Sequence, residues 1–252
     1  MLSIDNYRRK ELLEKKETCT ITQSLLSLPE KIFIPRLEGM KTLGAASYLD
    51  IKNKNSAKYW GSNGNDINYY LELAKKFNPI LKNAYSELYE KLCNFFSNEF
   101  NVECKLHEKA ALPGFHIYDN RENFSSQNAH IPHFDGQYEE LGELFNTNKK
   151  STDYNQRTLS FTLPISLPNT KCGMRTWDFH YNETQNKNKE EIKNKLKRIK
   201  PQLIDYKTGT MVYHSGKSLH QIKSWSAMKN EKPRITLQGH GILIDNELYL
   251  YW

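Results

Sequence analysis

Apolar positions recur every three or four residues along 66–100, a pattern that predicts one long amphipathic helix. Pro79 lies inside this segment and has no backbone N–H, so we expect a kink or break near 77–78. A single broad apolar stripe on a long helix most simply packs against a sheet, and we interpret the segment as scaffold. The stripe consists of Leu73, Phe77, Leu81, Tyr85, Leu88, Leu92 and Phe95.

From residue 102 onward the pattern changes to short segments rich in Val, Ile, Phe, Tyr and Thr, separated by Gly, Pro and Asn. Several short strands at close spacing predict an antiparallel sandwich or barrel. We therefore expect one domain over 1–252 of the α+β class, mainly β with flanking helices. Residues 1–101 would form a mainly helical support and 102–252 the β-rich core. The predicted strands lie in "PGFHIYD", "RTLSFTLPISLP", "MRTWDFHY", "GTMVYHS", "HQIKSW", "RITLQGHGILI" and "LYLYW".

A polar insertion at about 182–200 interrupts this core and is expected to hold a short amphipathic helix at most. The chain of 252 residues has a net charge of +7 and a pI near 9.0, which permits anionic partners. However, the lysines are widely spread, and glutamates interrupt the dense run "NKNKEEIKNKLKRIK". We interpret the charge as a solvated surface and expect no nucleic-acid partner.

No apolar run approaches the roughly 20 residues of a membrane span. The first residues, "MLSIDNYRRKELLEKKETC", are basic but contain no apolar stretch typical of a secretory signal. The four cysteines are scattered without CxxC spacing, which favours reduced thiols over a disulfide framework or zinc cluster. We therefore expect a cytoplasmic protein with no membrane association.

The candidate chemistry begins in "HIPHFDG", where one residue separates His133 from Asp135. On an extended strand, side chains at i and i+2 point to the same face, so this imidazole and carboxylate could bind one metal ion. Segment 209–225 reads as a strand, a glycine-containing turn and a second strand that begins near His220. His214, before the turn, is the competing candidate.

Fourteen residues beyond His220, the strand "RITLQGHG" carries Arg234 and Thr236 on one face. Two imidazoles and a carboxylate form a facial triad, which leaves three open positions on an iron(II) ion. A buried arginine nearby suits bidentate capture of a carboxylate on a co-substrate.

The order His133-x-Asp135, His220, Arg234-x-Thr236 resembles the iron(II)/2-oxoglutarate-dependent oxygenases, over about residues 102–250. The resemblance implies a double-stranded β-helix, a jelly-roll or cupin-like barrel, which agrees with the strand pattern. It implies Fe(II) ligands His133, Asp135 and His220, because His220 keeps the family-like position after the glycine turn. Arg234 and Thr236 would bind 2-oxoglutarate, and O2 would be the other co-substrate.

In this family, oxidative decarboxylation of 2-oxoglutarate to succinate and CO2 drives oxidation of the substrate. Related halogenases replace the acidic ligand with a small residue, so Asp135 favours hydroxylation. The segments "LPGFHIYDN", "HIPHFDGQY" and "YLYW" look most like a group acting on free amino acids, which includes lysine halogenases. Lysine-acting members carry an acid where this chain has His116, which puts lysine in doubt.

Five residues are candidate substrate contacts, and each has a structural alternative. His116 is equally a packed core histidine, His130 a polar residue at the barrel mouth, and Trp177 a core residue. Tyr251 and Trp252 could instead seal the barrel as a hydrophobic plug.

Two other functions remain open. One is an oxygenase that modifies a peptide or protein, with the basic surface as a docking face. The other is a cupin-like barrel that binds a metal or ligand without 2-oxoglutarate chemistry. Arg234 argues against the second, because a binding-only barrel needs no carboxylate clamp at that spacing.

Overall fold

The strands of the protein form two sheets in the computed structural model. The structure describes residues 2, 4, 7–36, 39–51, 66–118, 132–136, 138, 141–142, 144–145, 157–168, 172–184, 189–223 and 232–252. Within these ranges a nine-stranded sheet has the order β1-β9-β6-β11-β5-β3-β2, and β12 pairs with both β11 and β4. A three-stranded sheet has the order β10-β7-β8.

The strands that the sequence predicts are all present. These are β5 (Gly114–Tyr118), β6 (Thr158–Ser166), β7 (Gly173–His180), β9 (Thr210–His214), β10 (Ser218–Ile222), β11 (Arg234–Ile244) and β12 (Glu247–Tyr251). Five further short strands have no clear sequence signal: β1 (Arg8–Glu11), β2 (Ile34–Pro35), β3 (Met40–Leu43), β4 (Glu103–Leu106) and β8 (Gln202–Asp205). The nine-stranded sheet therefore draws strands from 1–101 as well as from 102–252.

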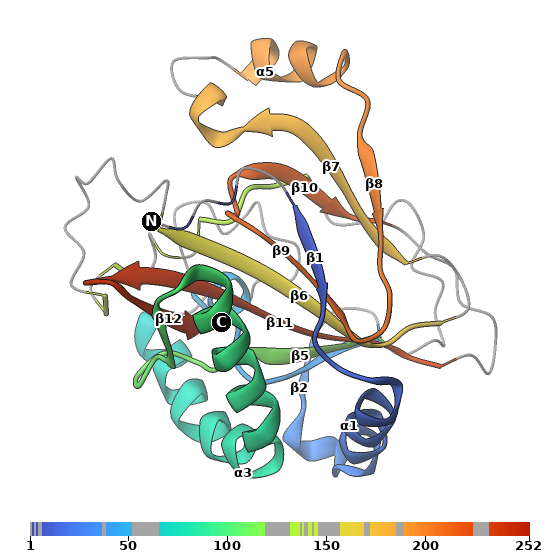
Figure 1. The fold of residues 1–252 in the computed structure, drawn as a ribbon, viewed down its shortest axis with the longest axis vertical. Helices are drawn as coiled ribbons and strands as arrows, with labels where there is room; N and C mark the ends of the chain where they lie inside the picture. Colours follow the sequence, from blue (N-terminus) through green and yellow to red (C-terminus); the bar gives the residue numbers. More distant parts are fainter. Residues whose placement is uncertain are drawn as a thin grey trace.

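Helices cover the outer face of the large sheet. Figure 1 shows α1 (Lys15–Ser27) and α3 (Ile67–Phe100) on one side of this sheet, and β7, β8 and β10 on the other. The apolar stripe of α3 packs into the main hydrophobic core, as expected for scaffold. Its buried members there include Phe77, Leu81, Leu88 and Leu92, against Phe115, Leu163, Ile235 and Leu237 of the sheet, and Phe96 is buried beside them while Phe95 is only partly buried.

The kink or break expected near 77–78 does not occur there, and this prediction of its position is wrong. Helix α3 continues through Pro79 and is kinked at Tyr85 instead, where the backbone departs from helical values (φ −136°, ψ 31°). Tertiary bonds hold the proline turn in place, because the Asn78 side chain donates to the Ala110 carbonyl oxygen and accepts from the Leu112 N–H. The proline therefore removes one backbone donor without ending the helix.

Two short elements complete the fold. The 3₁₀ turn η1 (Glu30–Ile32) precedes β2, and the single-turn helix α2 (Ser47–Asp50) follows β3.

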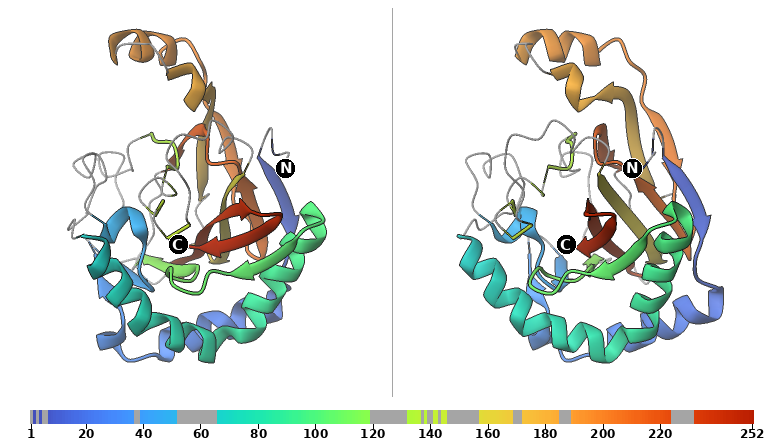
Figure 2. Two further views of the ribbon diagram at one scale, coloured as in Figure 1. Left: turned by 90° about the vertical axis from the view of Figure 1, so that its left-hand side faces the viewer. Right: turned by 60° about the vertical axis from the view of Figure 1, so that its left-hand side comes forward.

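The polar insertion lies between β7 and β8 and contains η4 (Tyr181–Thr184) and α5 (Lys189–Leu196). Figure 2 shows this insertion projecting away from the two sheets. No helix in the described ranges has the length and apolarity that a membrane crossing requires.

Candidate metal centre and pocket

Backbone pairing places the first candidate ligands beside the third. The His133 N–H donates to the His220 carbonyl oxygen at 2.9 Å, and the His220 N–H returns a bond to the His133 carbonyl oxygen at 3.0 Å. The Asp135 N–H donates to the Gly216 carbonyl oxygen at 2.8 Å. The segment that carries His133 and Asp135 is therefore held against the turn before β10 and the strand itself.

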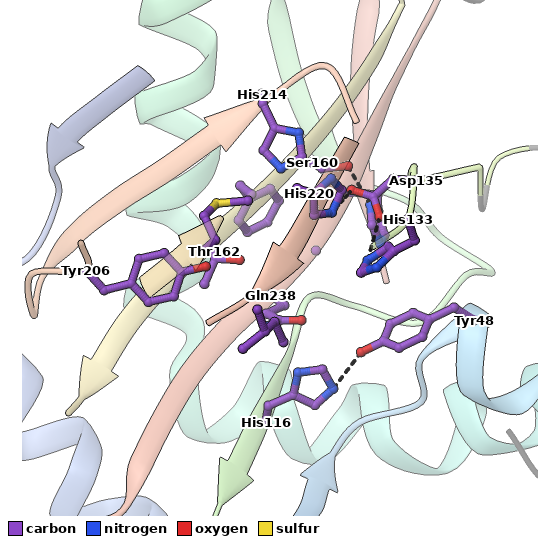
Figure 3. A pocket seen from close by; sticks show the side chains of 15 residues that line it. Tyr48, His116, His133, Asp135, Ser160, Thr162, Tyr206, His214, His220 and Gln238 are labelled. Atoms are coloured by element: carbon purple, nitrogen blue, oxygen red, sulfur yellow. Dashed lines mark hydrogen bonds and ion pairs between the residues drawn. The ribbon is translucent and has the colours of Figure 1, made fainter. Parts of the chain in front are cut away.

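The three side chains converge on one point. Nε2 of His133 lies 3.8 Å from Oδ1 of Asp135, and Nε2 of His220 lies 3.5 Å from Oδ2 of the same carboxylate. One ligand atom from each residue falls within 4.8 Å of the others, a spacing that could hold a metal ion (Figure 3). The trio that the sequence predicts is thus brought together by the fold.

Hydrogen bonding and charge prepare this group for a cation. Nδ1 of His220 donates to the Ser218 carbonyl oxygen at 2.9 Å, so Nε2 is the nitrogen that faces Asp135. Burial raises the pKa of Asp135, but His220, His240 and His133 outweigh it and hold that pKa well below its usual range. Burial lowers the pKa of His220, but the attraction of the Asp135 carboxylate is larger, so the pKa of His220 is raised above its usual value.

The competing histidine, His214, lies next to the group but outside it. Its ring centroid is 4.8 Å from that of His220 and 4.6 Å from that of Tyr7. Its Nδ1 accepts the Gly216 N–H at 3.0 Å, and burial lowers its pKa to about 3, so the ring is neutral. His240, which has no predicted role, lies in the same pocket, with Nδ1 3.0 Å from Oγ of Ser160.

Arg234 and Thr236 are fully buried on β11, on the strand face that also carries Gln238. The Arg234 guanidinium lies between two aromatic rings, 5.0 Å from the centroid of Tyr118 and 5.7 Å from that of Tyr206. Thr236 accepts a hydrogen bond from Nε2 of Gln238 at 3.3 Å. Tyr206 and Gln238 line the pocket, so Arg234 and Thr236 each contact a residue of the pocket wall.

Of the five candidate substrate contacts, His116 lines the pocket. Tyr251 and Trp252 are buried behind the wall: the Tyr251 ring is 5.7 Å from His240, and the Trp252 ring is 5.0 Å from His116. Trp177 is half-buried on β7 and is not among the described residues that line the pocket. His130 lies outside the described residues.

The pocket lies between the two sheets, and its wall includes residues that sequence reasoning missed. Gln238 could have been found, because it continues the i, i+2 series of Arg234 and Thr236. Tyr48 on α2 has no comparable signal. The complete described lining consists of Tyr48, His116, His133, Asp135, Ser160, Phe161, Thr162, Met174, Tyr206, His214, His220, Ile222, Gln238, Gly239 and His240.

Comparison with known proteins gives a match in structure but not in sequence. No family sequence profile matches the chain, and no curated protein sequence does. An N-substituted L-amino acid dioxygenase from Burkholderia ambifaria AMMD in complex with alpha-KG is similar in structure, with a TM-score of 0.58 and 12% identity. A second structure of that dioxygenase gives a TM-score of 0.57 at 12% identity.

Both alignments cover 98% of this chain and 86% of the dioxygenase chain. At this identity the likeness establishes the fold, and the predicted class, mainly β with a double-stranded β-helix core, is confirmed. The chain therefore shares its fold with a dioxygenase that binds alpha-ketoglutarate, as its motifs indicated.

Proposed function

We propose that the protein is an Fe(II)/2-oxoglutarate-dependent oxygenase that hydroxylates a C–H bond of a small molecule, and that this small molecule is a free amino acid. The observation that carries the proposal is the convergence of His133, Asp135 and His220 in a pocket backed by Arg234. The fold shared with the amino acid dioxygenase supports the same function.

The donor set fits iron(II). Two imidazole nitrogens and one carboxylate oxygen on one side of an ion leave the remaining coordination positions open for co-substrates. The side chains of Asp135 and His220 are about nine-tenths buried, while His133 keeps 28% of its side chain exposed. One side of the group thus remains accessible from the pocket.

When bound, iron, 2-oxoglutarate and O2 would supply the oxidising chemistry, in which one oxygen atom of O2 enters succinate, formed with CO2, and the other enters the substrate. The protein contributes position and exclusion of water. We assign Arg234 to the far carboxylate of 2-oxoglutarate, because a guanidinium can bind a carboxylate through two parallel hydrogen bonds. Thr236 would add a hydrogen bond there, and Phe161, Met174 and Ile222 supply apolar wall.

A free amino acid is the favoured substrate on the resemblance of the motifs, and the structurally similar dioxygenase, named for N-substituted L-amino acids, supports an amino acid substrate. His116 is the best supported of the five substrate contacts, since it lines the pocket. Trp177, Tyr251, Trp252 and His130 remain proposals. All four cysteines are free thiols, which fits a reducing cytoplasm.

The test is succinate formation from 2-oxoglutarate under air, with Fe(II), against free L-amino acids and their N-acetyl derivatives. Mass spectrometry of each mixture would detect the gain of one oxygen atom. Succinate stimulated by one amino acid, together with that mass gain, is the expected result. Arg234→Ala serves as the control and should form little succinate at the same 2-oxoglutarate concentration.

Two other outcomes would redirect the assignment. Slow succinate formation that no amino acid stimulates would favour a peptide or protein substrate, with the basic surface as its docking face. Absence of succinate from protein shown to contain Fe(II) would contradict the oxygenase proposal and favour a metal-binding barrel.

A further inference from the structure

A hydrogen-bonded pair faces the metal group across the pocket. The Tyr48 hydroxyl lies 2.7 Å from Nε2 of His116, and both residues line the pocket. His116 is 2% exposed, whereas Tyr48 is half-buried. Figure 3 shows the pair opposite His133 and Asp135, with the Tyr48 hydroxyl directed toward His116.

Contacts outside the pocket hold both Tyr48 and His116 in position. Tyr48 lies on α2, which is fixed by a buried ion pair: the Arg36 guanidinium donates two hydrogen bonds to Asp50, at 2.7 and 2.8 Å. The Asp50 carboxylate also accepts a hydrogen bond from the N–H of Ala46, the residue that precedes α2. His116 packs against Trp252, whose carbonyl oxygen accepts the N–H of Ser47 beside Tyr48. The pair is thus a preorganised polar element rather than two mobile side chains.

The charges of the wall decide what this pair could bind. Among the described lining residues Asp135 is the only carboxylate, and His133 and His220 already hold it. A substrate ammonium group at Tyr48 would therefore find no opposite charge in this part of the wall. The described lining also contains no lysine or arginine, so the Tyr48 hydroxyl, hydrogen-bonded to His116, is a donor available to an anionic group on that side.

We infer that Tyr48 and His116 form the binding site for a carboxylate of the substrate, and that they select an amino acid bound as its free acid. The inference rests on the proposed function. In the complex the Tyr48 O–H donates to the substrate carboxylate, and the Tyr48 oxygen accepts from Nε2–H of His116. Burial raises the pKa of Tyr48 well above its ordinary value, so the hydroxyl keeps the proton that it donates.

The test measures binding rather than turnover. The amino acid that stimulates succinate formation, and derivatives with each carboxylate replaced in turn by a primary amide, are titrated anaerobically into protein loaded with Mn(II) and 2-oxoglutarate. Wild-type protein should bind the acid about 10-fold or more tighter than one of the amides, as expected for a charge-assisted hydrogen bond. In Tyr48→Phe this ratio should fall to within about 2-fold, since the donor is gone.

Two further variants keep the test decisive. His116→Gln should reduce the ratio in the same direction if Tyr48→Phe does not fold. Tyr69→Phe changes an exposed tyrosine on α3 and should leave the ratio at its wild-type value. An unchanged ratio in folded Tyr48→Phe, alongside normal wild-type turnover, would overturn the inference and leave the oxygenase function intact. Failure of every amino acid to stimulate succinate formation by the wild-type protein would instead overturn the inference together with the free-amino-acid substrate.

Discussion

Gly216 lies directly against Asp135. A Cβ atom added at Gly216 would come within 3.0 Å of Cβ of Asp135 and 2.9 Å of Oγ of Ser160. Gly216 also has a backbone φ of +79°, a conformation that residues with a side chain rarely adopt. Its carbonyl oxygen accepts a hydrogen bond from the Asp135 N–H. The turn before β10 therefore sets the position of the carboxylate in the metal group.

Gly216→Ala should displace Asp135 and weaken metal binding by about 10-fold or more, the range expected when the support of a ligand is lost. Anaerobic titration with Co(II), followed by its visible absorption, would measure the dissociation constant. Gly136→Ala is the matched control, because an added Cβ there meets nothing within 4 Å. Equal metal affinity in the two variants would contradict this role for Gly216.

Removal of His220 should abolish stoichiometric metal binding, whereas removal of His214 should not. His220 offers Nε2 to the group, but Nδ1 of His214 is occupied by the Gly216 N–H. Iron content after anaerobic loading and desalting would separate His220→Ala from His214→Ala. Loss of iron in His214→Ala with retention in His220→Ala would reverse the assignment.

Arg234→Ala should raise the KM for 2-oxoglutarate by about 100-fold, because a buried bidentate ion pair would be lost. Arg234→Lys keeps the charge without the planar group between Tyr118 and Tyr206, so an intermediate KM is expected. Both variants should bind Fe(II) as the wild type does. Unchanged KM values would remove Arg234 from the co-substrate site.

Asp50→Asn should lower the free energy of unfolding by about 3–5 kcal/mol, since Arg36 would remain buried without its charge partner. Because α2 carries Tyr48, the substrate KM should rise as well. Urea denaturation would measure the first effect. Lys207→Ala, which breaks an exposed ion pair with Glu11, should change stability by less than about 1 kcal/mol.

Glu99 predicts a pH dependence of stability. Its carboxylate accepts hydrogen bonds from Arg8, Lys10 and Tyr213, and joins β1 and β9 to the end of α3. Burial raises the pKa of Glu99, but these donors outweigh it and leave the pKa below its usual value.

The carboxylate therefore stabilises the fold above its unfolded-state pKa near 4.3, and this contribution is lost as pH falls through the lower folded-state pKa. Glu99→Gln should be less stable than wild type by about 1–2 kcal/mol at pH 7. The difference should shrink toward pH 3. Urea titrations at both pH values would test this, and an equal difference at the two would contradict it.

The sequence was sufficient for features with strong local periodicity or a distinctive order of residues. The stripe on 66–100 predicted α3, and alternation within β11 placed Arg234 and Thr236 on one face. The spacing of His133, Asp135 and His220 predicted a group that the fold assembles. In each case the information lies within one strand, one helix or one ordered motif.

Features created by tertiary contacts were not predictable. Strands β2 and β8 have two and four residues, too few for alternation to be read. Continuity of α3 through Pro79 depends on Asn78 bonds to residues more than 30 positions away. Tyr48 reaches His116 across 68 residues, and nothing near either residue in the sequence indicates that contact.

The distribution of the site over two sheets has a thermodynamic consequence. His220 belongs to the three-stranded sheet, whereas Arg234 belongs to the nine-stranded sheet. In the proposed complex, 2-oxoglutarate would contact the metal group at one end and Arg234 at the other. The bound co-substrate would therefore connect the two sheets non-covalently. The metal and the co-substrate should then raise the unfolding temperature together by more than the sum of their separate effects.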